Sequence, residues 1–232
     1  MTARYSTLAP DAGSDPRTAD RDSRVIGVLI SGRGSNLQAL IEAVQERRLD
    51  ARIAVVISNK AHAPGLDRAR AAAIDTLVVD HRAFPSRDAF DGEIARELRA
   101  RGVTLVCLAG FMRLIGRPLL DAYPDAILNV HPSLLPAFPG VDAQRQAFDH
   151  GVKITGATVH LVTGELDAGP IVLQSAVPVR DDDTADILSA RILIEEHRIY
   201  AAAVQLILDG GWRIEGRRFV QSKTPIPENL NP

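Results

Sequence analysis

The stretch RVIGVLISGRGSNLQALIEAV, residues 24–44, decides the fold of this chain. It begins with apolar residues 25–30, a run typical of a buried β-strand. A loop with two glycines, residues 31–36, follows directly. Apolar residues then recur at the i, i+3, i+4 and i+7 spacing of an amphipathic helix. They are Leu37, Leu40, Ile41 and Val44.

The same alternation of apolar strand and helix continues to residue 130. Helices are predicted after Pro64 and over 86–101, and further strands over 53–57, 77–79, 105–108 and 126–130. Strands that are apolar throughout and separated by helices indicate a parallel sheet covered on both faces. The pattern therefore predicts a doubly wound α/β fold.

The C-terminal part follows another pattern. Residues 153–162 and 171–179 are two longer runs that predict antiparallel strands, followed by a long buried helix over 186–208 and a hairpin over 212–220. The predicted fold class is thus α/β, a doubly wound, mostly parallel sheet with helices on both faces and an antiparallel C-terminal portion.

Length and composition suit one domain. Of the 232 residues, we expect 24–221 to form a single domain. Residues 1–23 are rich in Asp, Arg, Ser, Ala and Pro, which predicts a disordered extension. Residues 222–232 contain three prolines and are expected to form a loose tail.

Charge and cysteine content exclude several classes of protein. The net charge of −2 gives no indication of a nucleic-acid or membrane-surface partner. No apolar run reaches the ~18 residues of a membrane helix, and no signal peptide is recognised. The single cysteine, Cys107, lies in an apolar run and is interpreted as a buried, inert thiol. These features predict a cytoplasmic protein with small-molecule substrates; they give no oligomeric state.

The glycine loop is a candidate anion site. Backbone N–H groups at a helix N-terminus bind anions, and glycine lets a phosphate approach closely. The loop lacks the third glycine of a dinucleotide motif, because Leu37 stands there, and it lacks a Walker A lysine. A phosphomonoester fits better than NAD or ATP. A tight turn with Ser35 or Asn36 as helix cap remains the alternative.

The run NVHPSLLP, residues 129–136, carries the most information about chemistry. Asn129 and His131 stand two residues apart at the end of a predicted strand, so both point to one side. Open α/β sheets bind ligands at this end of their strands. An amide can hold a developing oxyanion and an imidazole can move a proton, as acyl transfer requires. The alternative is a histidine with local hydrogen bonds only. This interpretation is also favoured for His160, which lies in a strand, with a place near the site as its alternative.

The loop TGELDAGP, residues 163–170, adds a carboxylate. Asp167 next to His131 would raise the histidine pKa by stabilising imidazolium. A turn-forming aspartate before Gly169 is the alternative on local evidence.

Taken together, these motifs resemble the phosphoribosylglycinamide formyltransferases of purine synthesis. The resemblance runs from about residue 25 to residue 208. It includes residues 32–38, 58–60, 109–113, 129–136, 165–170 and 196–197. It implies glycinamide ribonucleotide as substrate and 10-formyltetrahydrofolate as co-substrate, with no metal.

The resemblance also implies roles for individual residues. The catalytic residues would be Asn129, His131 and Asp167. The substrate would be bound by Gly34, Ser35, Asn36, Leu37, Gln38 and Glu196. The folate would be bound by Arg87, Met112, Arg113, Leu114, Ile115, Thr163, Gly164, Glu165 and Leu166.

Two departures and three alternatives accompany the resemblance. The N-terminal extension, residues 1–23, is additional. Many relatives have histidine after residue 140, where this chain has VDAQ, residues 141–144. A formyltetrahydrofolate hydrolase shares the three catalytic residues, but it would carry a preceding regulatory domain. A methionyl-tRNA formyltransferase would add a C-terminal RNA-binding domain and a basic surface. A phosphate-binding module without catalysis would not need all three residues.

Overall fold

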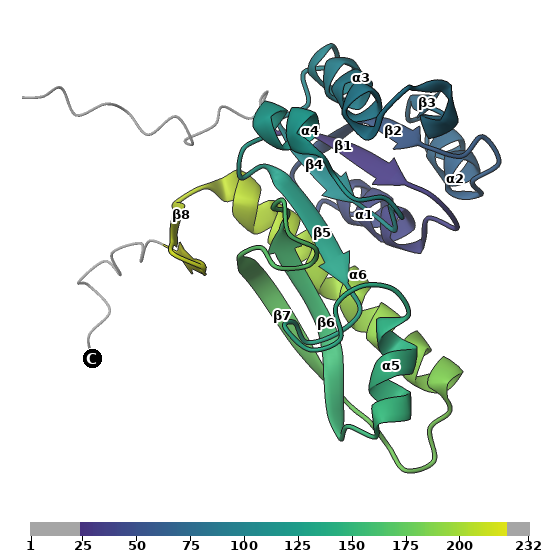
Figure 1. Ribbon diagram of the computed structural model, residues 1–232, viewed down its shortest axis with the longest axis vertical. Coiled ribbons are helices and arrows are strands. Elements are labelled where there is room, and N and C mark those ends of the chain that lie inside the picture. Colours follow the sequence, from purple (N-terminus) through teal and green to yellow (C-terminus); the bar gives the residue numbers. More distant parts are fainter. Residues whose placement is uncertain (1–23, 222–232) are drawn as a thin grey trace, which may run out of the picture.

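The computed structural model describes residues 24–221. The strands of this part of the chain form one nine-stranded sheet. The strand order is β3-β2-β1-β4-β5-β6-β7-β9-β8 (Figure 1). Residues 1–23 and 222–232, predicted as extension and tail, lie outside the described residues. No helix within 24–221 has the length and apolar character needed to cross a membrane.

Five strands run parallel. The chain visits β1 at the centre, crosses to β2 and β3 on one side, and returns to β4 and β5 on the other. These strands are β1 (Val25–Ile30), β2 (Arg52–Ser58), β3 (Thr76–Val78), β4 (Leu105–Leu108) and β5 (Ile127–His131). This is the reversal of direction expected of a doubly wound sheet.

The remaining strands extend the sheet with antiparallel pairs. β6 pairs antiparallel with both β5 and β7, and the terminal hairpin of β8 and β9 touches β7 at a single register position. These strands are β6 (Ile154–Leu161), β7 (Ile171–Pro178), β8 (Trp212–Glu215) and β9 (Arg218–Gln221). The antiparallel C-terminal portion is confirmed, including the hairpin turn at Gly216, where φ is +61°.

Helices cover both faces of the sheet. Side chains of α1, α2 and α6 form one core cluster with alternate residues of β1, and those of α3 and α4 form a second cluster with the others. The helices are α1 (Ser35–Gln45), α2 (Gly65–Ala71), α3 (Arg87–Arg99), α4 (Arg117–Ala122), α5 (Ala143–His150) and α6 (Ala185–Asp209). A 3-10 turn occupies His81–Ala83. The two core clusters explain why β1 carries no polar residue on either face.

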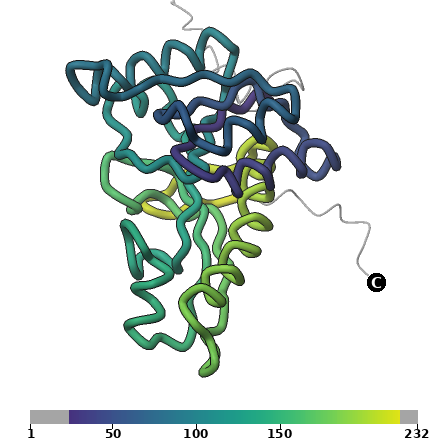
Figure 2. Tube along the Cα trace, turned by 90° about the vertical axis from the view of Figure 1, so that its right-hand side faces the viewer, coloured from purple at the N-terminus to yellow at the C-terminus, as the bar shows by residue number. Residues whose placement is uncertain are grey.

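The long helix α6 joins the two parts of the sheet. It packs against α1 beside the parallel strands and against β6 and β7 in the antiparallel part. Figure 2 shows the purple-to-teal N-terminal segments in the upper part and the green segments in the lower part, with α6 reaching from one to the other.

Two short helices, α4 and α5, are not predicted by the sequence. Each is too short to show a helical repeat, with six and eight residues. Other boundaries agree to within two residues, and Ser86 caps α3 as expected by accepting a hydrogen bond from the Ala89 amide. Burial raises the pKa of the Cys107 thiol to about 12, which confirms an inert cysteine.

Replacing Gly169 with alanine is expected to destabilise the protein. A Cβ there would lie 1.8 Å from the Leu161 carbonyl oxygen, so β6 and the loop before β7 would have to separate. Overpacking of ~3 kcal/mol would lower the melting temperature by about 6–12 °C. Calorimetry measures this, with Gly164→Ala as control, since a Cβ at Gly164 meets no atom within 4 Å. Equal melting temperatures for the two variants would contradict the prediction.

Candidate active site

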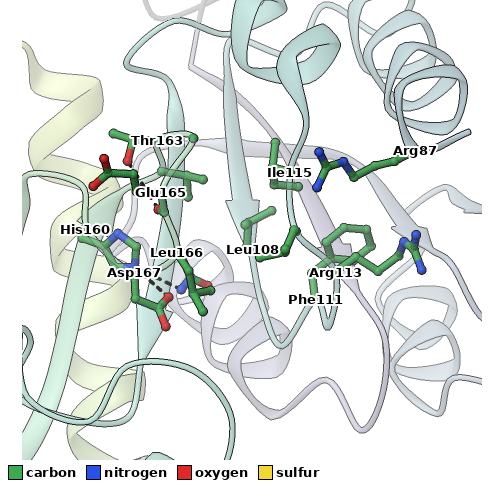
Figure 3. A pocket seen from close by; sticks show the side chains of 14 residues that line it. Arg87, Leu108, Phe111, Arg113, Ile115, His160, Thr163, Glu165, Leu166 and Asp167 are labelled. Atoms are coloured by element: carbon green, nitrogen blue, oxygen red, sulfur yellow. Dashed lines mark hydrogen bonds and ion pairs between the residues drawn. The ribbon is translucent and has the colours of Figure 1, made fainter.

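A pocket lies at the carboxyl ends of β4 and β5, as expected for an open α/β sheet. One wall comes from the start of α3 and the loop after β4, and the other from the loop after β6 (Figure 3). The walls contain Arg87, Phe111, Arg113, Leu114, Ile115, Val162, Thr163, Gly164, Glu165 and Leu166. Leu108, Asn129, His160 and Asp167 also line the pocket, so it combines an apolar slot with a polar end.

Asn129 is oriented by His160. The two residues are register partners in the antiparallel pair of β5 and β6, and Asn129 Nδ2 lies 3.1 Å from His160 Nε2. His160 Nδ1 lies 3.0 Å from the Leu161 carbonyl oxygen, which only accepts, so Nδ1 carries the proton. His160 Nε2 therefore accepts one amide hydrogen of Asn129. The second amide hydrogen remains for a ligand in the pocket.

His131 lies behind this polar end and contacts Asp167. Its Nδ1 is 3.4 Å from Asp167 Oδ2, and its Nε2 donates to the Phe138 carbonyl oxygen at 2.8 Å. Both groups facing the ring are acceptors, so an imidazolium with two protons satisfies both. The predicted approach of Asp167 to His131 is thus found, across 36 residues of sequence.

Asp167 is held from several sides. The Gly140 amide donates to its Oδ2 at 2.7 Å, and His160 Nε2 lies 3.7 Å from its Oδ1. Its own backbone has a φ of +49°, in the left-handed region. Burial raises the pKa of Asp167, but the hydrogen bond from the Gly140 amide and the charge of a protonated His131 lower it by more, so the net shift is downward. Asp167 is therefore a carboxylate at neutral pH.

Asp167 raises the His131 pKa, as expected, but the net shift of this pKa is downward. Burial lowers the His131 pKa from its usual 6.5 more than the Phe138 carbonyl and the Asp167 charge raise it. Asp167 acts in the predicted direction, but removal of the ring from water is the larger effect.

The glycine loop, the candidate anion site, leads into α1 next to a buried carboxylate. Gly34 has a φ of +69° at the N-terminus of α1, and Gln38 N donates to its carbonyl oxygen at 2.9 Å. Asn36 Nδ2 donates to Glu196 Oε2 at 2.8 Å, which joins α1 to α6. Glu196 is only 4% exposed, its Oε1 has no partner within residues 24–221, and burial raises its pKa while Asn36 lowers it. An unpartnered buried oxygen beside an anion site suits a polar substrate group.

A hydrogen-bond chain connects the glycine loop to the loop after β4. Ser31, the first residue of the glycine loop, accepts from the Met112 amide at 2.9 Å and donates to Asn59 Oδ1 at 2.6 Å. The Ser31 amide also donates to the Gly110 carbonyl oxygen at 3.1 Å. The loops after β1 and β4 are thereby fixed to each other.

The structure refines the sequence-predicted site. All predicted folate-binding residues line the pocket except Met112, whose side chain is 68% exposed. Leu37 is fully buried in the core, so its side chain cannot contact a substrate. His160, interpreted as structural from its place in a strand, belongs to the site. Its register position opposite Asn129 depends on strand pairing, and the sequence pattern alone gives no register.

No cluster of three or more metal-ligating side chains occurs within residues 24–221. The residues grouped at the polar end are an amide, two imidazoles and one carboxylate. On a mostly parallel α/β sheet, this combination defines an enzyme class that stabilises an oxyanion and moves protons with side chains.

Comparison with known proteins identifies the family. The family model described as formyl transferase matches residues 24–204. This chain therefore belongs to the formyl transferase family, and the resemblance noted in the sequence is confirmed.

Relatives with this domain exist as single enzymes and as parts of longer chains. Phosphoribosylglycinamide formyltransferase of Escherichia coli is 45% identical, over 80% of this chain and 87% of that protein. The trifunctional purine biosynthetic protein adenosine-3 of Bos taurus is 48% identical, and the match spans only 19% of its length. The crystal structure of glycinamide ribonucleotide transformylase 1 from Symbiobacterium toebii has a TM-score of 0.83 at 54% identity, over 90% of this chain and 98% of that one.

Proposed function

We propose that this chain transfers the formyl group of 10-formyltetrahydrofolate to the amine of glycinamide ribonucleotide. The observation that carries the proposal is the polar end of the pocket, where Asn129, His160 and Asp167 meet between an apolar slot and the glycine loop. The names of the E. coli and S. toebii relatives support the choice of substrates.

The pterin and its donor carbon would occupy the slot between the two walls. Leu108, Phe111 and Ile115 offer apolar surface there, while Arg87 and Arg113 offer positive charge to the anionic end of a folate. Burying a flat aromatic ring system against such side chains supplies most of the affinity in sites of this kind.

The substrate would lie between the glycine loop and the polar end. The N–H groups at the start of α1 would hold its phosphate, and Glu196 Oε1 would accept from a polar group nearer the amine. Because Asn36 and Glu196 are hydrogen-bonded to each other, the two ends of this subsite are fixed before the substrate arrives.

The reaction follows from these positions. The neutral amine attacks the formyl carbon, and the carbonyl oxygen becomes an oxyanion that the free hydrogen of the Asn129 amide can hold. The amine then loses a proton, the bond from carbon to N10 breaks, and N10 gains a proton. Protonated His131 gives its proton to N10 and then takes up the proton that the amine loses, with Asp167 stabilising the imidazolium.

His131 reaches the reacting atoms only after a local rearrangement. Its Nε2 proton is held by Phe138, whose backbone φ is +53°. A bound ligand that displaces this carbonyl would turn the same N–H toward the pocket. Hydrogen bonds of catalytic groups commonly change in this way between the free and bound states.

The decisive experiment measures formyl release from 10-formyltetrahydrofolate with and without glycinamide ribonucleotide. Release that requires the ribonucleotide and yields its formylated product supports the proposal. Release into water without the ribonucleotide would identify a hydrolase, and binding without any release would identify a module without catalysis.

Gly34→Ala is expected to weaken binding of the phosphorylated substrate. A Cβ at Gly34 would lie 2.7 Å from Gly65 Cα, and the φ of +69° is strained for alanine. A distortion worth ~1.4 kcal/mol corresponds to a roughly tenfold rise in the dissociation constant. Titration calorimetry with glycinamide ribonucleotide measures it. Gly32→Ala is the control, because a Cβ at Gly32 meets nothing within 4 Å; equal affinities in the two variants would argue against the loop as the phosphate site.

We also propose that residues 24–221 work as one domain and that the protein acts in the cytosol, on small molecules rather than nucleic acid. The buried thiol of Cys107 and the balanced charge are the features that support this.

A further inference from the structure

Asp91 is a buried acid that the proposed mechanism does not use. It lies in α3, is fully buried, and its Oδ2 accepts a hydrogen bond of 2.5 Å from the Gly116 amide. Its Oδ1 has no hydrogen-bond partner within the described part of the chain. A buried, incompletely paired carboxylate is destabilising unless nearby charges compensate, so its position calls for a reason.

The surroundings of Asp91 are the arginine side of the pocket. Burial raises the pKa of Asp91 and Asp88 adds to this effect, while the Gly116 amide and the charges of Arg87 and Arg113 lower it, so the net shift is upward. The Arg113 guanidinium also lies over the ring of Phe90, at 5.3 Å from its centroid. Both arginines line the pocket, as does Ile115 (Figure 3).

The loop that ends at Gly116 packs closely against Asp88 and Asp91. A Cβ at Gly116 would lie 2.8 Å from Asp91 Oδ2, 2.9 Å from Asp88 Oδ1 and 3.3 Å from Arg87 Nε. Glycine is therefore required at the point where the pocket wall, residues 113–116, returns to α3. The wall is attached to α3 at this point by the Asp91 carboxylate.

We propose that Asp91 is a positioning residue for the donor side of the pocket: its buried carboxylate fixes the 113–116 wall to α3 through the Gly116 amide, and thereby the position from which Arg113 faces an anionic ligand. The inference rests on the proposed function for the identity of that ligand, the folate donor. Asp91 touches neither ligand, so its effect is on donor binding rather than on the chemical step.

Two substitutions separate the contributions of shape and charge. Asp91→Asn keeps an oxygen that accepts from Gly116 but removes the charge, and Asp91→Ala removes both. Since a charge-assisted hydrogen bond is roughly twice as strong as a neutral one, we expect donor affinity to fall about threefold in the first variant and about tenfold in the second. Glu93→Gln, on the same helix and bonded to Arg96, is the matched control and should leave donor affinity unchanged.

Calorimetric titration with 10-formyltetrahydrofolate and with glycinamide ribonucleotide tests whether Asp91 affects donor binding alone. The proposal expects weaker donor binding, unchanged ribonucleotide binding and a KM effect confined to the donor. A general loss of structure would weaken both ligands and lower kcat. Equal loss for both ligands, or donor affinity within twofold of the parent in Asp91→Ala, would overturn the proposal. If Asp91→Ala does not fold, Asp91→Asn gives the same comparison.

Hydrogen exchange without ligand keeps the test independent of the proposed function. The Gly116 amide should exchange at least about tenfold faster in Asp91→Ala, while amides of β1 keep their rates. Unchanged exchange at Gly116 would overturn the role of Asp91 in fixing the wall. If the parent protein does not bind the folate at all, the proposed function fails, and the exchange rates still decide whether Asp91 holds this loop.

Discussion

Asp167→Asn is expected to lower turnover about a hundredfold at pH 7, the smaller end of what proton transfer by a side chain contributes. The asparagine oxygen can still accept from the Gly140 amide, so the loop keeps its position. What is lost is the charge that raises the His131 pKa against the effect of burial. The proportion of imidazolium therefore falls.

The pH–rate profile distinguishes the loss of the Asp167 charge from a structural disturbance of its loop. The reactive pair is a neutral amine with protonated His131. An α-amino group titrates at roughly pH 8, above His131. Between the two pKa values, the fraction of complexes with a neutral amine and a protonated His131 is therefore small and does not change with pH. Lowering the His131 pKa reduces this reactive fraction by the same factor at every pH between the two pKa values. It also moves the acidic limb of the pH–rate profile to lower pH. Steady-state rates from pH 5 to 9 measure both the decrease in turnover and the shift of the acidic limb.

Two results control the experiment. Asp149→Asn removes a carboxylate that pairs with Arg145 on the surface of α5, and it should leave the profile unchanged. Affinity for the ribonucleotide should also be unchanged in Asp167→Asn. Near-normal turnover in that variant would show that Asp167 is a turn residue only.

Asn129→Ala is expected to lower kcat by roughly 10²–10³, the effect of removing one oxyanion donor. The side chain lines the pocket at the end of β5, and one of its amide hydrogens is already bonded to His160. Both ligands should bind with nearly unchanged affinity, because the oxyanion exists only after attack. Single-turnover rates with both substrates saturating measure this effect.

The matched variant is Asn129→Asp, which has the same shape and presents negative charge to the oxyanion. It should lose at least as much activity as Asn129→Ala. A kcat within threefold of the parent in either variant would remove Asn129 from the mechanism. Melting temperatures identify any loss that comes from unfolding.

The strands and long helices could be predicted because the pattern of apolar residues that identifies each element lies within that element. A run such as residues 25–30 is apolar at every position since both of its faces are covered, and α1 has its apolar residues on one side. The short helices α4 and α5 escaped prediction because each has fewer residues than a recognisable repeat needs. Asn129 and His131 were recognisable because both lie on one strand.

The sequence by itself determined the α/β fold class, the glycine loop at the start of α1, and the candidates Asn129, His131, Asp167 and Glu196. Tertiary structure decided which of them meet. The register of β5 with β6 places His160 against Asn129, and the packing of α6 on α1 brings Glu196 to Asn36 across 160 residues. Burial, which depends on everything packed around a group, turned the net shift of the His131 pKa downward. Local sequence sets dihedral preferences and periodicity, whereas contacts and desolvation come from segments that only the folded chain brings together.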